Sequence, residues 1–220
     1  MEKILTNIFR LPLHYTIQTC LPTSYKNKLK NIKRHASFIL RNSIKFFEYY
    51  VDHDIEHAER VIHIINQLLT EEIKRKRLKP YEIYLLLAAT YCHDIGMGIN
   101  PEELVVFHNI PKKLEDLRAF IRKNHPISGA LYIRKNFKRF NIESYPEAEI
   151  ISKIVEAHSR SFGINKLPER WPITLKSGNI QIQLRFLGAI LRLADSMDIA
   201  YGRVPIEHFR WKDIARKEPK

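Results

Sequence analysis

PYEIYLLLAATYCHDIGMG, residues 80–98, is the stretch that decides the fold. Its opening proline suits the first turn of a helix, where a missing N–H has no partner to lose. From Tyr84 to Cys92 the chain is apolar on every side, which is typical of a helix buried in the centre of a protein. Two glycines then end the helix. The stretch therefore predicts a central buried helix that ends at the dipeptide His93-Asp94.

Apolar residues at helical spacing continue on both sides of this segment. One helix is expected to start near Asp54, with Asp52 or Asp54 as its N-cap, because the apolar residues between 55 and 69 fall on one face. Further helices are expected over about 112–123, 126–140, 146–161 and 181–201, with a loop over 163–178 before the last of them. Only seven glycines occur in 220 residues, which disfavours a fold of many strands and turns. We expect an all-α helical bundle.

A chain of this length can bury the core of one domain. Residues 1–35 carry Pro12, Pro22 and a basic run with weak periodicity, so we expect an N-terminal extension there. The single domain is expected over residues 36–210, followed by a basic C-terminal tail over 211–220.

The formal charge is +13, from 37 lysines and arginines against 24 aspartates and glutamates. Such a balance attracts polyanions, although each basic cluster taken alone is more typical of a solvated helix face. No apolar run is long enough to span a bilayer, and two cysteines cannot form a disulfide framework. We expect a cytoplasmic protein with no membrane partner.

Asp94 stands where arguments from stability would exclude it. At the C-terminal end of an apolar helix the helix dipole disfavours a carboxylate by roughly 0.3–1 kcal/mol, and burial without a partner costs more. A bound cation would remove both penalties, and His93 can supply a neutral nitrogen ligand beside it.

Asp195 poses the same problem on the apolar face of the last helix. Its alternative explanation is a salt bridge to Arg192 at i, i+3 spacing. His57, His125 and His158 are each compatible with an ordinary packed histidine when taken alone. It is their order along the chain, together with His93-Asp94 and Asp195, that indicates a metal site.

Five segments in this order resemble the HD phosphohydrolase superfamily: HAERV (57–61), TYCHDIGMG (90–98), NHPISGALYI (124–133), IVEAHSR (154–160) and LRLADSMD (191–198). The resemblance covers about residues 50–205 and implies a helical bundle that holds divalent metal. It implies His57, His93, Asp94 and Asp195 as ligands of a first ion. His125 and His158 match the histidines that members with two metals add, and Asp94 would then bridge both ions.

The expected catalytic residues are His93, Asp94 and Arg203, and the expected substrate-binding residues are Arg203, Arg60 and His53. Arginine matches the geometry of phosphate, and a surface role for Arg203 is the alternative. One or two ions of Mn, Fe, Zn, Ni or Mg suit the mixture of imidazole and carboxylate, with Mn or Fe favoured.

The segments HDIGM (93–97) and LRLADSMDIAYGR (191–203) are most similar to HD domains of the HD-CE type. Such domains are often joined to ATPase modules in signalling or defence proteins. An ATPase or signalling domain is therefore a possible partner. The expected function is hydrolysis of a phosphomonoester or phosphodiester bond, of a nucleotide in the first instance. Two alternatives stay open: a metal-dependent single-strand nuclease, suggested by the charge, and a non-catalytic module that senses a ligand.

Overall fold

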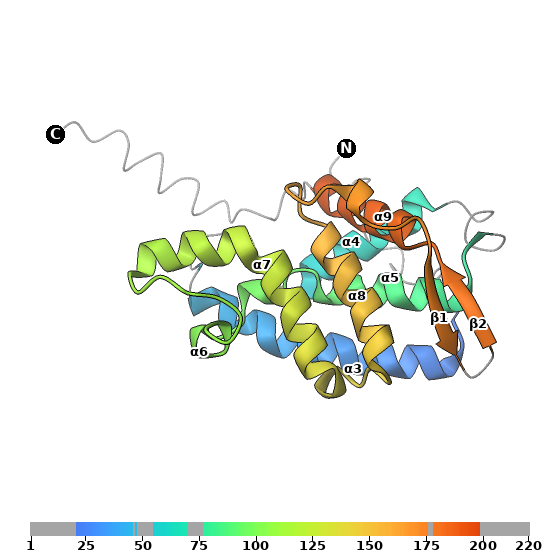
Figure 1. Ribbon diagram of the computed structural model, residues 1–220, viewed down its shortest axis with the longest axis horizontal. Coiled ribbons are helices and arrows are strands. Elements are labelled where there is room, and N and C mark those ends of the chain that lie inside the picture. The colour runs from blue at the N-terminus through green and yellow to red at the C-terminus, as the bar shows by residue number, and fades with distance from the viewer. Residues whose placement is uncertain (1–20, 46, 48–54, 70–76, 176–177, 199–220) are drawn as a thin grey trace, which may run out of the picture.

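The computed structural model describes residues 21–45, 47, 55–69, 77–175 and 178–198. The main elements there are α3 (Thr23–Leu40), α4 (Ile55–Leu68), α5 (Pro80–Cys92), α6 (Pro101–Leu104), α7 (Leu114–Asn136), α8 (Tyr145–Ala157) and α9 (Leu184–Met197), with one hairpin of β1 (Trp171–Leu175) and β2 (Gly178–Ile182) (Figure 1). Short 3-10 turns occur at η1 (Arg41–Lys45), η3 (Ile95–Met97), η4 (Phe137–Phe140) and η5 (Ile164–Lys166). The expected all-α, single-domain bundle is confirmed.

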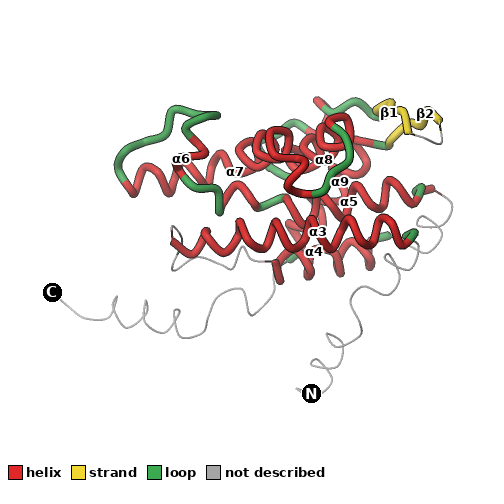
Figure 2. The backbone as a smooth tube through the Cα atoms, turned by 90° about the horizontal axis from the view of Figure 1, so that it is seen from below, coloured by secondary structure: helices red, strands yellow, loops and turns green. Residues whose placement is uncertain are grey.

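Helix α5 is the centre of the molecule, as the sequence predicts. Every residue from Tyr81 to Cys92 is buried. Figure 2 shows α5 between a layer formed by α3 and α4 and a second layer that contains α8 and α9. Because α5 is covered from both layers, its C-terminal end lies inside the bundle, where the ends of the neighbouring helices meet.

The boundary expected near residue 35 falls inside α3. This helix packs on α5 through an apolar stripe that includes Leu29, Ile32 and Ala36. The lysines and arginines between these positions obscure the stripe in the sequence. Lys28, which precedes this stripe, is itself buried against the acidic side chains of α8 and the turn before it. The expected boundary near residue 210 lies outside the described residues.

A buried carboxylate joins α3, α5 and α8. Glu147 accepts hydrogen bonds from the hydroxyl groups of Tyr81 at 3.1 Å and Tyr84 at 2.7 Å. The ammonium group of Lys28 lies 4.0 Å from the same carboxylate. Burial and the negative charge of Glu147 raise the pKa of Tyr84 well above its usual range. The tyrosines therefore remain neutral donors, and the network holds α3 against the core.

Helix α7 is one continuous helix, whereas the sequence suggested a break before Pro126. A proline inside a helix loses a backbone hydrogen bond and costs about 3 kcal/mol. Here the helix continues because residues on both sides of Pro126, among them Ile121 and Ile133, are buried against α8 and η3. Tertiary packing outweighs the local cost.

The segment expected as a loop contains the β1–β2 hairpin instead. Trp171 pairs with Ile182 and Ile173 with Ile180 in an antiparallel register. The strands are too short for their alternation to stand out among the prolines and glycines of the segment. Helix α9 consequently begins at Leu184, later than expected. Helices α4, α5 and α8 lie within a few residues of their predicted positions, whereas α3 and α6 were not predicted. The proposed N-caps of α4 lie outside the described residues.

Two glycines allow the backbone of the turn after α5 to contact the backbones of neighbouring helices directly. A Cβ atom on Gly96 would overlap the backbone carbonyl of His125 in α7, and one on Gly98 would overlap the carbonyl of Ile39 in α3. Gly129 makes the reciprocal approach from α7, because a Cβ atom added there would lie 3.3 Å from the backbone nitrogen of Gly96. These contacts fix the distance between Asp94 and His125.

Candidate metal centre

Five helices bring six predicted ligands together in two groups of three. His57 comes from α4, His93 and Asp94 from the end of α5, and the remaining three are His125 in α7, His158 at the end of α8 and Asp195 in α9. The first triplet is His57, His93 and Asp195; the second is Asp94, His125 and His158. Within each triplet the potential ligand atoms lie within 4.8 Å of one another, so either group could hold a metal ion.

In the first triplet the two histidine rings approach through their Nε2 atoms. His57 Nε2 lies 3.1 Å from His93 Nε2 and 3.2 Å from Asp195 Oδ1. His93 Nε2 lies 3.7 Å from the same carboxylate oxygen. Both histidine side chains are almost completely buried. Nitrogen and oxygen ligands thus converge on one point inside the bundle.

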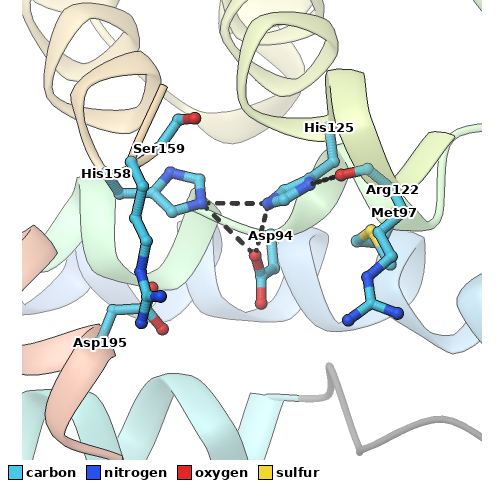
Figure 3. Close-up of a pocket in the computed structure, with 8 residues that line it drawn as sticks. Asp94, Met97, Arg122, His125, His158, Ser159 and Asp195 are labelled. Atoms are coloured by element: carbon cyan, nitrogen blue, oxygen red, sulfur yellow. Dashed lines mark hydrogen bonds and ion pairs between the residues drawn. The ribbon is translucent and has the colours of Figure 1, made fainter. Parts of the chain in front are cut away.

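The second triplet repeats this arrangement beside the first. His125 Nε2 lies 3.1 Å from His158 Nε2 and 3.2 Å from Asp94 Oδ1 (Figure 3). His158 Nε2 lies 3.7 Å from that oxygen.

Asp94 faces both triplets, one oxygen to each. Its Oδ1 atom points to the second triplet, while Oδ2 lies 3.6 Å from His57 Nε2 and 3.3 Å from His93 Nε2. A carboxylate placed in this way is suited to bridge two cations. A role in binding cations would explain why a carboxylate stands at the C-terminal end of α5, where the helix dipole disfavours it.

Three of the histidines have their protons fixed by the backbone. His93, His125 and His158 each use Nδ1 to donate to the carbonyl oxygen three residues earlier, at 2.7, 2.8 and 2.5 Å. Since a carbonyl oxygen can only accept, Nδ1 carries a proton in each ring, and Nε2 presents a lone pair whenever the ring is neutral. Two such lone pairs 3.1 Å apart repel unless a cation lies between them. The donor chemistry of the second triplet therefore fits a metal ion.

The position of each histidine explains why a backbone carbonyl is able to accept a hydrogen bond from its ring. Pro126 has no N–H, so the carbonyl of Arg122 lacks its usual partner four residues on and accepts from His125 instead. His93 and His158 follow the last turns of α5 and α8, where helix carbonyls have no partner within the helix.

His57 is oriented differently, by a carboxylate that sequence reasoning missed. Its Nδ1 donates to Asp198 Oδ2 at 2.6 Å, and Arg60 Nε donates to the two oxygens of Asp198 at 3.3 and 3.1 Å. Metal-bound histidines commonly donate their second N–H to a carboxylate in this manner. Asp198 stands three residues after Asp195, at helical spacing. That spacing, together with an arginine three residues after His57, was the only hint in the sequence that Asp198 contacts His57.

The charges in the two triplets shift the pKa values of the ligands in opposite directions. Burial lowers the pKa of His93, but the carboxylates of Asp94 and Asp195 outweigh it and raise the pKa to about 9. Burial and the neighbouring rings of His125 and His93 lower the pKa of His158 to about 3. Burial raises the pKa of Asp195, yet its hydrogen bond with His57 and the charge on His93 bring it down to about 2. Without metal, a proton on His93 thus partly replaces the missing positive charge.

The alternative explanation of Asp195, a salt bridge to Arg192, does not match the contacts of that arginine. The Arg192 guanidinium donates to the carbonyl of Ala157 at 2.8 Å from Nε and to that of Phe162 at 2.7 Å from Nη2. It thereby holds the end of α8 beside His158, and Asp195 faces the histidines.

A cavity of about 360 Å³ opens beside the triplets. The predicted ligands Asp94, His125, His158 and Asp195 line it, together with Met97, Arg122, Ser159 and Arg160. Sequence reasoning did not select Arg122 or Arg160, although each stands within three residues of a predicted histidine ligand. Of the expected substrate-binding residues, Arg60 is engaged with Asp198, while His53 and Arg203 lie outside the described residues.

A helical bundle with a histidine, a histidine–aspartate doublet and a distal aspartate around one centre defines an HD-domain protein. The model of the HD-CE family matches residues 47–217, which is more than half of the chain, and the chain belongs to this family. The superfamily relationship suggests a metal-dependent hydrolase, and the two triplets could hold divalent metal. No curated protein and no solved structure matches the chain. Among the described residues, no helix has the length and apolar character that crossing a membrane requires.

Proposed function

We propose that this chain is a phosphohydrolase with two metal ions, which cleaves a phosphomonoester or phosphodiester bond, of a nucleotide in the first instance. The single observation that supports it most is the Asp94 carboxylate, which faces one histidine-containing triplet with each of its oxygens. When bound, divalent ions polarise phosphoryl oxygens and lower the pKa of water. The mixed imidazole and carboxylate ligands favour Mn or Fe.

The chain's own residues prepare the site for such ions. The backbone carbonyls behind His93, His125 and His158 hold the rings in one tautomer, and Asp198 does the same for His57. The low pKa of His158 keeps this ligand neutral at physiological pH. The cavity beside the second triplet gives a phosphate ester access to the centre. Few cysteines, with Cys92 buried and its thiol pKa raised by burial, are consistent with a cytoplasmic setting.

The test is hydrolysis of bis(p-nitrophenyl) phosphate by the purified, Mn²⁺-loaded protein. We expect turnover in the wild type and a loss of at least about a hundredfold in Asp94→Ala. Asp116→Ala, which removes an exposed aspartate from the first turn of α7, is the matched control and should retain activity. If the metal-loaded protein cleaves neither this diester nor the monoester p-nitrophenyl phosphate, the proposed phosphohydrolase function is contradicted.

A further inference from the structure

Helix α3 presents to solvent a face that combines cations with an exposed aromatic ring. The exposed residues Lys30, Arg34, Phe38 and Arg41 recur at spacings of three or four, so they form one line along the helix, which we call the basic stripe. Phe38 is 68% exposed, more than any other large hydrophobic side chain among the described residues. The opposite face of α3 is buried against the core.

The cations of the basic stripe are not neutralised by neighbouring acids. Neither α3 nor η1 contains an aspartate or a glutamate. The acidic side chains that reach α3 contact Lys28 and Lys33, which lie outside the stripe. Within the described part of the chain, the stripe forms no ion pair, and Arg34 donates to the amide oxygen of Asn31 at 3.4 Å. The stripe is therefore a surface of uncompensated positive charge.

The basic character continues onto the neighbouring turn η4. The ring of His35 packs edge-on against a phenylalanine of η4, which also carries the exposed side chains of Lys138 and Arg139. Arg139 is partly balanced by Glu103, at 4.0 Å. Phe38 comes one helical turn after His35 and so lies on the side of the stripe that faces η4.

The basic stripe is separate from the metal centre. Helix α3 supplies none of the six ligands, and the stripe lies on the face opposite to the one that packs on α5. In Figure 1, α3 runs along the bottom of the bundle, whereas α9, which carries Asp195, lies at the top. Helix α3 also precedes residues 47–217, which match the HD-CE family. The family relationship therefore does not account for this surface.

A single-stranded nucleic acid is the partner that the stripe fits best. Surfaces that bind single strands combine cations, which pair with phosphates, with aromatic rings on which unpaired bases stack. From Lys30 to Arg41 the stripe is about 16 Å long, enough to follow several linked phosphates. A duplex hides the faces of its bases, so Phe38 would gain no stacking there. A helix that binds a membrane surface needs a broad exposed apolar face, and that of α3 is already buried.

We propose that the basic stripe of α3 binds single-stranded nucleic acid, with the phosphates on Lys30, Arg34 and Arg41 and a base stacked on Phe38. The strand lies on the outside of the bundle, and its binding requires no metal ion. The inference does not depend on the proposed phosphohydrolase function.

The test is the fluorescence anisotropy of a short labelled oligothymidylate, titrated with the full-length chain in EDTA. We expect Phe38→Ala to weaken binding at least about fivefold, the loss of one stacked base, and to leave the affinity for a duplex unchanged. The double variant R34Q/R41Q should lower the slope of log affinity against log salt concentration by about 1.4, since each phosphate contact of a single strand contributes about 0.7.

Two controls match these substitutions elsewhere on the surface. Tyr145→Ala removes an exposed aromatic ring from α8, and K112Q/K113Q removes two exposed lysines just before and at the N-cap of α7. The first should keep the wild-type affinity, and the second should keep the wild-type slope. Circular dichroism verifies that all variants are folded.

Four outcomes would overturn the inference. The wild type could fail to bind the strand, or its affinity could be unchanged in Phe38→Ala, which would leave a surface for polyanions in general. Loss of binding in Asp94→Ala would place the strand at the metal centre instead. Binding to phosphatidylserine vesicles but not to the strand would indicate a membrane surface. Because binding is measured without metal, these failures are separate from a failure to hydrolyse bis(p-nitrophenyl) phosphate.

Discussion

At His57 the orientation of a single ring depends on a carboxylate from the far end of the sequence. Asp198 is buried and accepts from both His57 and Arg60. Its pKa stays low because these two partners outweigh the effect of burial. The ionised carboxylate accepts the Nδ1 proton of His57, and the Nε2 atom of the ring then faces the first triplet.

Replacement of Asp198 by asparagine should therefore weaken metal binding at the first triplet. The loss of a carboxylate behind a metal-bound histidine commonly lowers affinity by about 10- to 100-fold. Competition with a fluorescent chelator measures the affinity, and Glu56→Gln on the exposed face of α4 is the control for charge. An affinity within about twofold of the wild type would show that Asp198 does not orient a ligand.

Metal affinity should also depend on pH in a defined direction. The pKa of His93 is raised to about 9 in the metal-free protein, so this ring is protonated at pH 7 and an ion must displace the proton. Affinity should rise with pH up to about 9, by about tenfold for each pH unit if one proton is released. Mn²⁺ titrations at pH 7 and pH 8 test this, and equal affinities at the two values would contradict it.

At the scale of single residues, the sequence indicates which side chains gather in the two triplets better than it indicates what surrounds them. His93-Asp94 and Asp195 stand out because charged groups on apolar helices need a partner. Asp198 has the same character, but its partner His57 lies 141 positions away in the chain. The role of such a residue depends on which helices pack together, and that information is absent from the local pattern.

At the scale of elements, the approach of η3 to α7 sets the distance between Asp94 and His125. Gly96→Ala would place a Cβ atom against the carbonyl of His125 and push α7 away from Asp94. We expect the free energy of unfolding to fall by about 1–3 kcal/mol and binding of the second ion to be lost first. Urea denaturation and metal titration measure these effects. Gly163→Ala, whose Cβ would make only ordinary contacts of 3.5 Å or more, is the control.

Pro126 links the regularity of α7 to the orientation of His125. Pro126→Ala would restore an N–H that competes with His125 for the carbonyl of Arg122. The expected result is a more stable protein, by up to about 3 kcal/mol, with affinity for the second ion reduced about tenfold. Thermal unfolding and Mn²⁺ titration together test this prediction. Higher stability with unchanged affinity for the second ion would show that the proline has no role in the site.

The same proline explains why the sequence suggested two helices here. Local propensity places a break at Pro126, whereas the packing of α7 on α8 and η3 keeps the helix continuous. Helix α3 shows the converse: its basic residues hide an apolar stripe that only contact with α5 reveals. The start of a helix such as α5 at Pro80 was predictable because it depends on the local sequence alone.

At the scale of the whole molecule, the polar network that supports the fold and the candidate centre occupy opposite ends of α8. Glu147 lies in the first turn of this helix and His158 directly follows its last residue, about 16 Å further along a helical rise of about 1.5 Å per residue. Stability and metal binding should therefore be separable by mutation.

Tyr84→Phe tests this separation. The variant loses a buried hydrogen bond to the Glu147 carboxylate, so the free energy of unfolding should fall by about 1.5–3 kcal/mol while metal affinity stays unchanged. Tyr145→Phe, at an exposed tyrosine in the same helix as Glu147, is the control. A large drop in metal affinity for Tyr84→Phe would mean that the two ends of α8 are coupled.

The most direct test of the central claim is the number of Mn²⁺ ions bound per chain at saturation, measured by equilibrium dialysis. Two triplets that Asp94 faces with one oxygen each predict two ions in the wild type. One ion is expected in His125→Ala, since that substitution removes a ligand of the second triplet alone. A wild-type chain that binds no divalent ion would contradict the account, and one that binds a single ion would limit the centre to one triplet.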